Sequence, residues 1–552
     1  MGRGDDHHPR LILPRRALFQ GAGMATLAAA WQPTRAAVPE GPPKGQIIVG
    51  LSQEPTRFHP LRAHIEVDDG VHLNLFSALW RISPDGTFVP DLATEVPSIA
   101  NGGISRDGLT WRVKLRSDVT WHDGAPFSAE DVKFTLDLIR NPNFPAMSRS
   151  GHNMVQDIKV LSPTELTWTM EQVYAPYFAI LAWTQIVPKH VPGAAAEGQD
   201  VSFNNLPIGT GPFKWGERRP GDYVSLVANE KFYGDGPHVA RLVFKYIPDM
   251  TGLKTQFVTG AIDVLGIAGI TPDNLDEVKA VPGLKLYAAP SGYLTSFMFN
   301  NGLPVFQDPA VREALYLSMD KDAILNDIFY GNDIPTESYL PQQSWAYDPN
   351  LPKHVFDVAK ANALLDQAGW KHGSDGIRKK NGVRLSFDCS TVAGNHLREQ
   401  TQQFLQQGWQ KIGAELSIKN YPAAVVWGDF WRKSQFQSTI VGAIFSIGSD
   451  PDASDRLGSW NIPVKTGTGS NTMQYANLEV DRLLHESVAT LDQEKRRQNY
   501  WRVQELVRKD LPFLPIAQQK STEGTKVKVQ GYQPNINYRS NCWNARDWKW
   551  SA

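Results

Sequence analysis

Strict alternation of apolar and charged residues marks residues 110–116, where apolar side chains fall on one face and Arg or Lys on the other. A period of two is typical of a half-buried strand. Ser128 follows, and Asp131 three residues later completes a capping box that begins a helix. This stretch therefore predicts a strand followed by an amphipathic helix.

Five further stretches carry apolar residues at helical spacing. Asp308 and Asp357 stand where the N-caps of two of these helices are expected, and Pro512 stops the last helix. The predicted helices cover residues 309–315, 358–368, 397–412, 478–488 and 503–507.

Short β-branched and aromatic runs lie between and before these helices. They predict strands at residues 47–51, 223–228, 241–247, 284–288, 294–300, 384–389 and 415–419. Strands and helices mix without a strict βα repeat, which indicates α/β or α+β lobes.

The length and composition fit a large globular protein with more than one core. The chain has 552 residues, of which 41% are apolar and 20% charged. At about 100–200 residues a domain, this length predicts two to four lobes. The formal net charge of −1 gives no basic field for nucleic acid. The 17 tryptophans are many for this length; some must lie in the core, and a surplus of rigid aromatic surface also suits a ligand cleft.

The first 37 residues have the pattern of a signal peptide. A positive segment that includes Arg15 and Arg16 precedes a mild apolar run, residues 17–31, and small residues follow near Ala37. The adjacent arginines favour twin-arginine export over an ordinary secretory signal. No cysteine lies near the cleavage region, so no lipid anchor is expected. We predict a periplasmic protein.

Two cysteines, Cys389 and Cys542, leave two alternatives open. They could form one disulfide, or they could stay as two free thiols, which we favour.

Enzyme signatures are absent from the sequence. There is no nucleophile elbow, zinc-protease motif or phosphate-binding loop, so we expect no catalytic residue, no cofactor and no enzyme activity. His59, His64 and His72 fit no standard helix face, and we expect no metal site. An acidic cluster, Asp450 to Asp455, suits either a cation or ligand amine, or simply a solvated turn.

Several separated motifs resemble one family. Residues 121–132 carry Trp-His-Asp-Gly followed by Asp-Val, residues 208–213 carry Gly-Thr-Gly-Pro, and weaker matches occur at 308–312, 408–413 and 511–516. Together they resemble the extracellular solute-binding proteins of family 5, the peptide- and nickel-type receptors of ABC importers.

The resemblance implies a fold and a domain order. The fold would be α/β, a bilobal periplasmic-binding-protein fold of the type II, cluster C-like kind, with an inserted extra domain. Domain I would comprise residues 38–84, 188–303 and 514–552, domain II residues 85–187, and domain III residues 304–513. Residues 121–132 would then mark the fold in domain II and lie away from the ligand, and Gly209 and Gly211 would be turn glycines.

The family uses the cleft between domains I and III, which implies a set of ligand-binding residues. They are Glu54, Tyr293, Thr295, Phe297, Trp427, Phe445, Ser446, Ile447, Asp450, Asp452 and Trp460.

One position departs from the family pattern. Peptide-binding members place an aspartate four residues before a late proline, to hold the peptide's amino group, whereas this chain has Ile447 there. A buried ammonium without its carboxylate would cost several kcal/mol. Asp450 or Asp452 is the nearest substitute.

The resemblance as a whole implies a monomeric receptor that passes a peptide or peptide-like solute to a membrane permease. An opine, an oligosaccharide or a metal complex is the alternative cargo. The less favoured alternative function is that of a periplasmic hydrolase.

Overall fold

The computed structural model describes residues 42–195, 202–467 and 469–551. The predicted signal peptide lies outside these residues. Within them, no helix combines the length and the apolar character that crossing a membrane requires.

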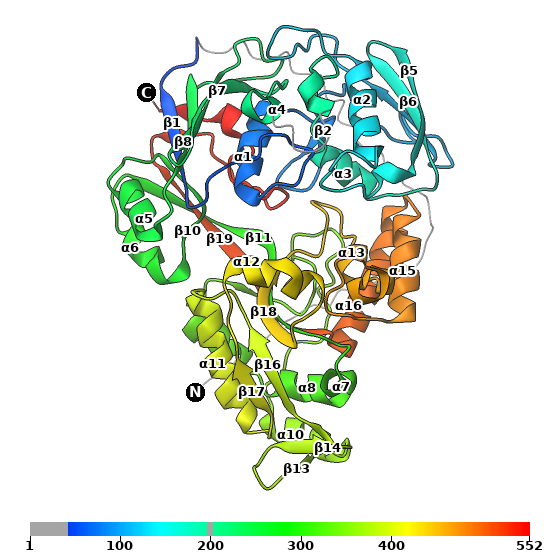
Figure 1. Cartoon of the computed structure of the whole chain (residues 1–552), viewed down its shortest axis with the longest axis vertical. Helices are drawn as coiled ribbons and strands as arrows, with labels where there is room; N and C mark the ends of the chain where they lie inside the picture. The colour runs from blue at the N-terminus through cyan, green and yellow to red at the C-terminus, as the bar shows by residue number, and fades with distance from the viewer. Residues whose placement is uncertain (1–41, 196–201, 468, 552) are drawn as a thin grey trace, which may run out of the picture. The chain divides into compact units, whose positions relative to one another are not determined.

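One large mixed sheet forms the centre of the fold. Its strands follow the order β17 (Glu415–Ile418), β16 (Ser386–Ser390), β18 (Ser438–Ala443), β11 (Leu284–Phe299), β19 (Phe513–Lys526), β10 (Val264–Ile270), β1 (Gln46–Leu51), β9 (Arg241–Tyr246), β8 (Tyr223–Ala228) and β7 (Phe213–Arg219), and β12 (Ile334–Pro335) also pairs with β19. Figure 1 shows β11 and β19 running beside each other through the middle of the molecule.

These two strands connect the two halves of the sheet. The second half of β11 pairs with β18 as well as with β19, and the second half of β19 pairs with β10. The sequence predicts separate strands at 284–288 and 294–300, but the structure has one strand with a register shift between Pro290 and Leu294. Pairing with β19 holds the two pieces together, so the local breakers only interrupt the register.

The remaining strands form four small sheets. These are β4 (Thr110–Lys114), β6 (Glu165–Met170) and β5 (Val155–Ser162); β13 (Lys371–His372), β14 (Arg378–Lys380) and β15 (Val383–Arg384); β2 (Trp80–Ile82) with β3 (Phe88–Pro90); and β20 (Val529–Gln530) with β21 (Lys549–Trp550).

The α-helices surround these sheets. They are α1 (Glu66–Leu75), α2 (Ala129–Arg140), α3 (Tyr177–Trp183), α4 (Ser202–Asn205), α5 (Met250–Val258), α6 (Leu275–Lys279), α7 (Pro304–Gln307), α8 (Pro309–Leu317), α9 (Lys321–Ala323), α10 (Val358–Gln367), α11 (His396–Gln410), α12 (Ala423–Val425), α13 (Ser454–Leu457), α14 (Pro463–Thr466), α15 (Leu478–Val488) and α16 (Gln493–Asp510).

The predicted helix starts are confirmed. Ser128 and Asp131 form the capping box of α2, and the side chains of Asp308 and Asp357 accept backbone N–H groups at the starts of α8 and α10. Each cap satisfies amides that would otherwise lack partners in the first turn, an effect worth about 1 kcal/mol.

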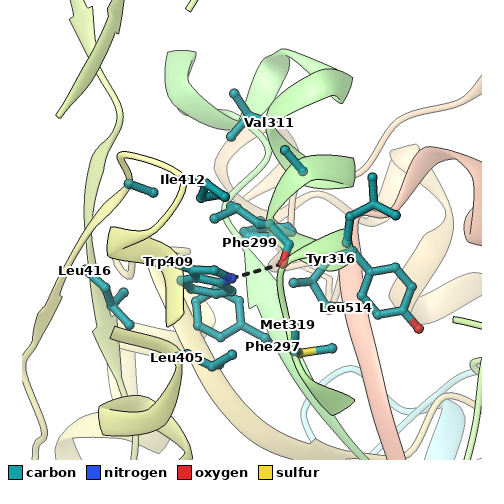
Figure 2. Close-up of a cluster of buried hydrophobic side chains, with 14 of the residues drawn as sticks. Phe297, Phe299, Val311, Tyr316, Met319, Leu405, Trp409, Ile412, Leu416 and Leu514 are labelled. Carbon is teal, nitrogen blue, oxygen red and sulfur yellow. Dashed lines mark hydrogen bonds between the residues drawn. The ribbon is translucent and has the colours of Figure 1, made fainter. Parts of the chain in front are cut away.

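A cluster of buried side chains fills the space between α8, α11 and the sheet (Figure 2). The ring of Phe297 meets Trp409 edge-on, with 4.9 Å between the ring centroids, and the indole N–H of Trp409 donates to the Leu315 carbonyl at 3.0 Å. Phe297 is fully buried in this cluster. Thr295, two residues earlier on β11, lines the cavity described below.

The favoured alternative for the cysteines is confirmed, because Cys389 and Cys542 are both buried free thiols. Gly209 and Gly211 are structural, but through close packing and not through a left-handed turn. Neither has a positive φ, and a Cβ atom on either would lie within 2.5 Å of the backbone oxygen of Leu75 or Asn74. The predicted domain boundaries stay a prediction.

Candidate ligand-binding site

A cavity of about 1940 Å³ lies beside the register shift of β11. Ser291, Gly292 and Tyr293, the residues of the shift, form part of its wall. Its other walls come from the loop before α1, the segment 444–450 after β18, residues 519–523 of β19 and the segment 534–541. Ligand pockets for small molecules usually measure about 300–1000 Å³. This cavity therefore has room for a large solute with ordered water.

Most of the predicted ligand-binding residues line this cavity. They are Tyr293, Thr295, Trp427, Phe445, Ser446, Ile447 and Asp450. Residues 289–293 and 295 of β11 and the segment 444–450 after β18 line the same cavity.

Four predicted residues lie elsewhere. Glu54 binds Arg218 at 2.7 Å, Phe297 is in the core, and Asp452 is buried and accepts from the Ser454 hydroxyl at 2.5 Å. Trp460 stacks on His485 with 3.9 Å between ring centroids. Each has its contacts within the protein, so we remove all four from the site.

The segment 444–450 makes a tight turn. Ile447 and Asp450 exchange backbone hydrogen bonds of 2.9 Å, and Gly448 adopts a φ of 55°. A Cβ atom on Gly448 would lie 3.1 Å from the Ile82 side chain and 3.2 Å from that of Trp183. The turn therefore packs tightly against residues that come from far earlier in the chain.

A second contact closes the cavity near α15. The amide of Ala175 donates to the Val488 carbonyl at 2.8 Å, and Leu491 packs against the buried cluster formed by residues 79–186 and Tyr538. Ala175 and Leu491 both line the cavity. These contacts therefore join two distant parts of the chain at the cavity wall.

Asp450 is held by an ion pair inside the wall. Both carboxylate oxygens accept from the Arg496 guanidinium, at 2.7 and 2.8 Å, and both side chains are buried. Arg496 also lies over the rings of Trp345 and Tyr500. The expectation that Asp450 replaces the missing family aspartate is therefore wrong, because its charge is already neutralised.

Asp452 does not replace it either. Burial, and then the neighbouring charge of Asp450, raise the pKa of Asp452 to about 7. A carboxyl that resists ionisation is a poor partner for an ammonium group.

Arg398 is a cavity-lining residue that sequence reasoning missed. It lies in the first turn of α11, lines the cavity and is only partly exposed. Among the described residues its side chain has neither an ion pair nor a hydrogen bond. Burial lowers its pKa to about 10, and no acidic neighbour offsets this effect. The wall thus presents a desolvated guanidinium without a counter-ion.

Gly442 makes room for this cation. It stands opposite Thr295 in the pairing of β18 with β11. A Cβ atom there would lie 2.6 Å from Nε2 of Gln519 and 3.1 Å from Nη2 of Arg398. Gln519 in turn donates to Thr295 Oγ1 at 2.9 Å. A glycine thus lets two polar side chains converge on the cavity wall.

Two carboxyl groups in the cavity are also desolvated. Burial raises the pKa of Glu66 and that of Glu523 to about 7. Both line the cavity, so it carries proton-holding acids as well as a free cation.

The most recognisable motif takes no part in the site. No residue of 121–132 lines the cavity. His122 binds backbone groups of Gly209 and Gly211 at 3.1 Å, and Asp131 caps α2. These contacts of the motif are structural, in keeping with what the resemblance implies.

A mixed α/β fold around a large, partly charged cavity defines a protein that encloses a solute. A model of bacterial extracellular solute-binding proteins, family 5 (middle region), matches residues 87–462. The chain belongs to this family, which consists of non-catalytic solute-binding proteins.

Named relatives agree in length and fold. The oligopeptide-binding protein AppA of Bacillus subtilis is 26% identical over 525 residues, 92% of each chain, and the nickel-binding periplasmic protein of Escherichia coli is 27% identical over 480 residues, 84% of this chain and 87% of that one. The structure of NikZ from Campylobacter jejuni in complex with Ni(L-His) covers 92% of this chain and all of its own, with 27% identity and a TM-score of 0.80. The chain is therefore a substrate-binding protein of the ABC-transporter type.

Proposed function

We propose that this protein captures a carboxylate-bearing, peptide-like solute and delivers it to an inner-membrane ABC permease. The observation that carries the proposal is Arg398, a desolvated cation on the cavity wall with no partner among the described residues. Relatives named for oligopeptides and nickel support the transport role.

An unpaired charge in a protein wall is costly, and a ligand carboxylate offsets the cost. Removing a charge from water costs several kcal/mol, unless a partner and hydrogen bonds replace the water. A guanidinium presents two parallel N–H groups that match a carboxylate. Arg398 is therefore better explained as half of an ion pair whose other half is the solute.

The carboxylate, and not an amino group, is the anchor we infer. Ile447 offers no charge, Asp450 is paired with Arg496, and Asp452 resists ionisation. A peptide held by its amino terminus in this loop would lack a partner there. We infer a solute whose acid group binds Arg398.

A metal chelate is the second candidate. Chelating ligands carry several carboxylates, which suits Arg398, and a solved relative holds Ni(L-His). An opine has the same acid groups. A neutral oligosaccharide would leave Arg398 unpaired, so it ranks below these.

Capture and release follow from the contacts around the cavity. A solute that touches both walls stabilises the closed arrangement by its higher affinity for that arrangement. Release then requires the Ala175–Val488 hydrogen bond and the Leu491 packing to break. We propose that docking on the permease supplies this opening, and that the receptor acts as a periplasmic monomer exported by the twin-arginine route.

Native mass spectrometry of the purified protein tests the proposal. We expect a bound solute with at least one carboxylate, and the same solute should raise the melting temperature when it is added back. A screen of free-acid peptides, their C-terminal amides, opines and oligosaccharides provides the controls. If amides or neutral sugars stabilise the protein as much as the acids do, the proposed ligand class is wrong.

A further inference from the structure

Two histidines and an aspartate converge where the loop before α1 meets that helix. His64 lies in the loop, and Asp69 and His72 lie three residues apart on one face of α1. One nitrogen of each histidine and one oxygen of the aspartate fall within 4.8 Å of one another. The sequence pattern offered no helix face for His64 and His72 because His64 precedes the helix.

Hydrogen bonds fix the tautomer of His72. Its Nε2 lies 2.7 Å from the carbonyl of Arg57, which can only accept, so this nitrogen carries the proton. Nδ1 is then a lone-pair donor. His72 is 1% exposed, and no partner for Nδ1 occurs among the described residues. An anchored ring with a free lone pair is the usual state of a metal-binding histidine.

His64 has an acceptor at each ring nitrogen. Nδ1 lies 2.7 Å from the carbonyl of Arg62, and Nε2 lies 2.8 Å from Oδ1 of Asp69. A neutral imidazole has one N–H and cannot donate to both. Either an extra proton or a metal ion beside Nε2 and the carboxylate resolves the conflict.

We propose that His64 Nε2, Asp69 Oδ1 and His72 Nδ1 bind a divalent transition-metal ion. Two imidazole nitrogens and one carboxylate oxygen suit Zn²⁺, Ni²⁺ or Co²⁺, whereas Mg²⁺ prefers an all-oxygen shell. With bonds of about 2.1 Å, the ligand atoms of a tetrahedral ion lie about 3.4 Å apart, so the set has to contract wherever its present spacing approaches 4.8 Å. The Arg539 guanidinium, 2.9 Å from Oδ2 of Asp69, holds the carboxylate in place.

The ion would have a free coordination position on the cavity side. His64 and Asp69 line the cavity, whereas His72 closes the site from behind. Three protein ligands leave room for a water or a solute atom. The site goes beyond the proposed function, because it needs neither Arg398 nor a captured solute.

Cobalt titration of the full chain, purified without a histidine tag and stripped with a chelator, tests the site. We expect one equivalent to bind, with visible absorption of low-symmetry Co²⁺, and Zn²⁺ to displace it, while Mg²⁺ has no effect. His64→Gln and Asp69→Asn should each weaken binding at least about 10-fold. The exposed His396→Gln is the matched control, and His7 and His8 are present in every variant.

Two results would overturn the site. One is a wild-type chain that binds no Co²⁺, which would leave only an imidazolium–carboxylate pair. The other is His64→Gln binding as tightly as the wild type. Should a variant fail to fold, a zinc-edge anomalous map of wild-type crystals decides: a peak between the three side chains supports the site, and its absence rejects it. Arg398→Ala should bind Co²⁺ like the wild type, so failure of the proposed ligand class and failure of the metal site are separable.

Discussion

Two arginines line the same cavity in opposite states. Arg496 on α16 is held by both oxygens of Asp450 and by two aromatic rings, whereas Arg398 on α11 has no partner among the described residues. The charge of Arg496 is neutralised within the protein, whereas the charge of Arg398 is available to a bound solute. The difference separates a structural cation from a ligand-binding one, which residue type alone does not do.

Asp450→Asn should have the largest effect on stability. It leaves the buried Arg496 guanidinium without its counter-ion, and breaking a buried pair in this way costs about 3–5 kcal/mol of unfolding free energy. Urea denaturation measures the loss. Asp455→Asn is the matched control, because this cavity acid has no ion pair among the described residues, and we expect less than about 1 kcal/mol. Equal losses in the two variants would remove the structural role of the pair.

Arg398→Ala should change the stability of the protein little and its affinity for the solute strongly. Stability should stay within about 1 kcal/mol of the wild type or rise, because an unpaired, desolvated charge is removed. Solute affinity should fall by about 1.5–3 kcal/mol, or roughly 10- to 150-fold. Melting temperature and isothermal titration measure the two effects. A strongly destabilised variant would mean that Arg398 is structural, like Arg496.

Asp452→Asn should change how stability depends on pH. The folded pKa of about 7 exceeds the ordinary value of 3.8, so the wild type is favoured below pH 4 and loses this contribution as pH rises through 7. The amide side chain of the variant has no proton to lose over this pH range. Its unfolding free energy, relative to the wild type, should therefore rise by up to about 4 kcal/mol between pH 4 and pH 8, at about 1.4 kcal/mol for each unit of the shift. A pH-independent difference would show that Asp452 is ionised throughout.

Gly442→Ala should have the smallest effect. The added methyl group displaces the ends of Arg398 and Gln519, both flexible, so we expect affinity to fall a few-fold, by about 1 kcal/mol or less. Gly408→Ala, inside α11, is the control: it should raise stability by up to about 1 kcal/mol and leave affinity unchanged. An unchanged affinity in Gly442→Ala would mean that this glycine does not position Arg398.

Local patterns predicted the framework well. Ser128, Asp308 and Asp357 each begin a helix as expected, because caps depend on residues within one turn. Local composition predicted two separate strands at residues 284–288 and 294–300, yet β11 proved continuous. Its pairing with β19 joins positions more than 200 residues apart, which no local pattern contains.

The site was only partly predictable, because it too depends on contacts between residues that are far apart in the sequence. Segment 444–450 was located correctly, but Asp450 was assigned to the ligand because its partner, Arg496, is 46 residues away. Phe297 was assigned to the ligand, whereas it packs in the core against Trp409. Arg398 gave no signal in the sequence, since a helical arginine usually reaches solvent, and only the packing around Gly442 turns it inward.

A double-mutant cycle between Arg398 and the solute's carboxylate tests the central claim most directly. Calorimetry would compare a bound free-acid solute with its amide, on the wild type and on Arg398→Ala. If the two groups pair, amidation should weaken binding to the wild type by about 1.5–3 kcal/mol and should have little effect on the variant. Equal losses on both proteins would give a coupling energy of zero and contradict the assignment of Arg398 as the anchor.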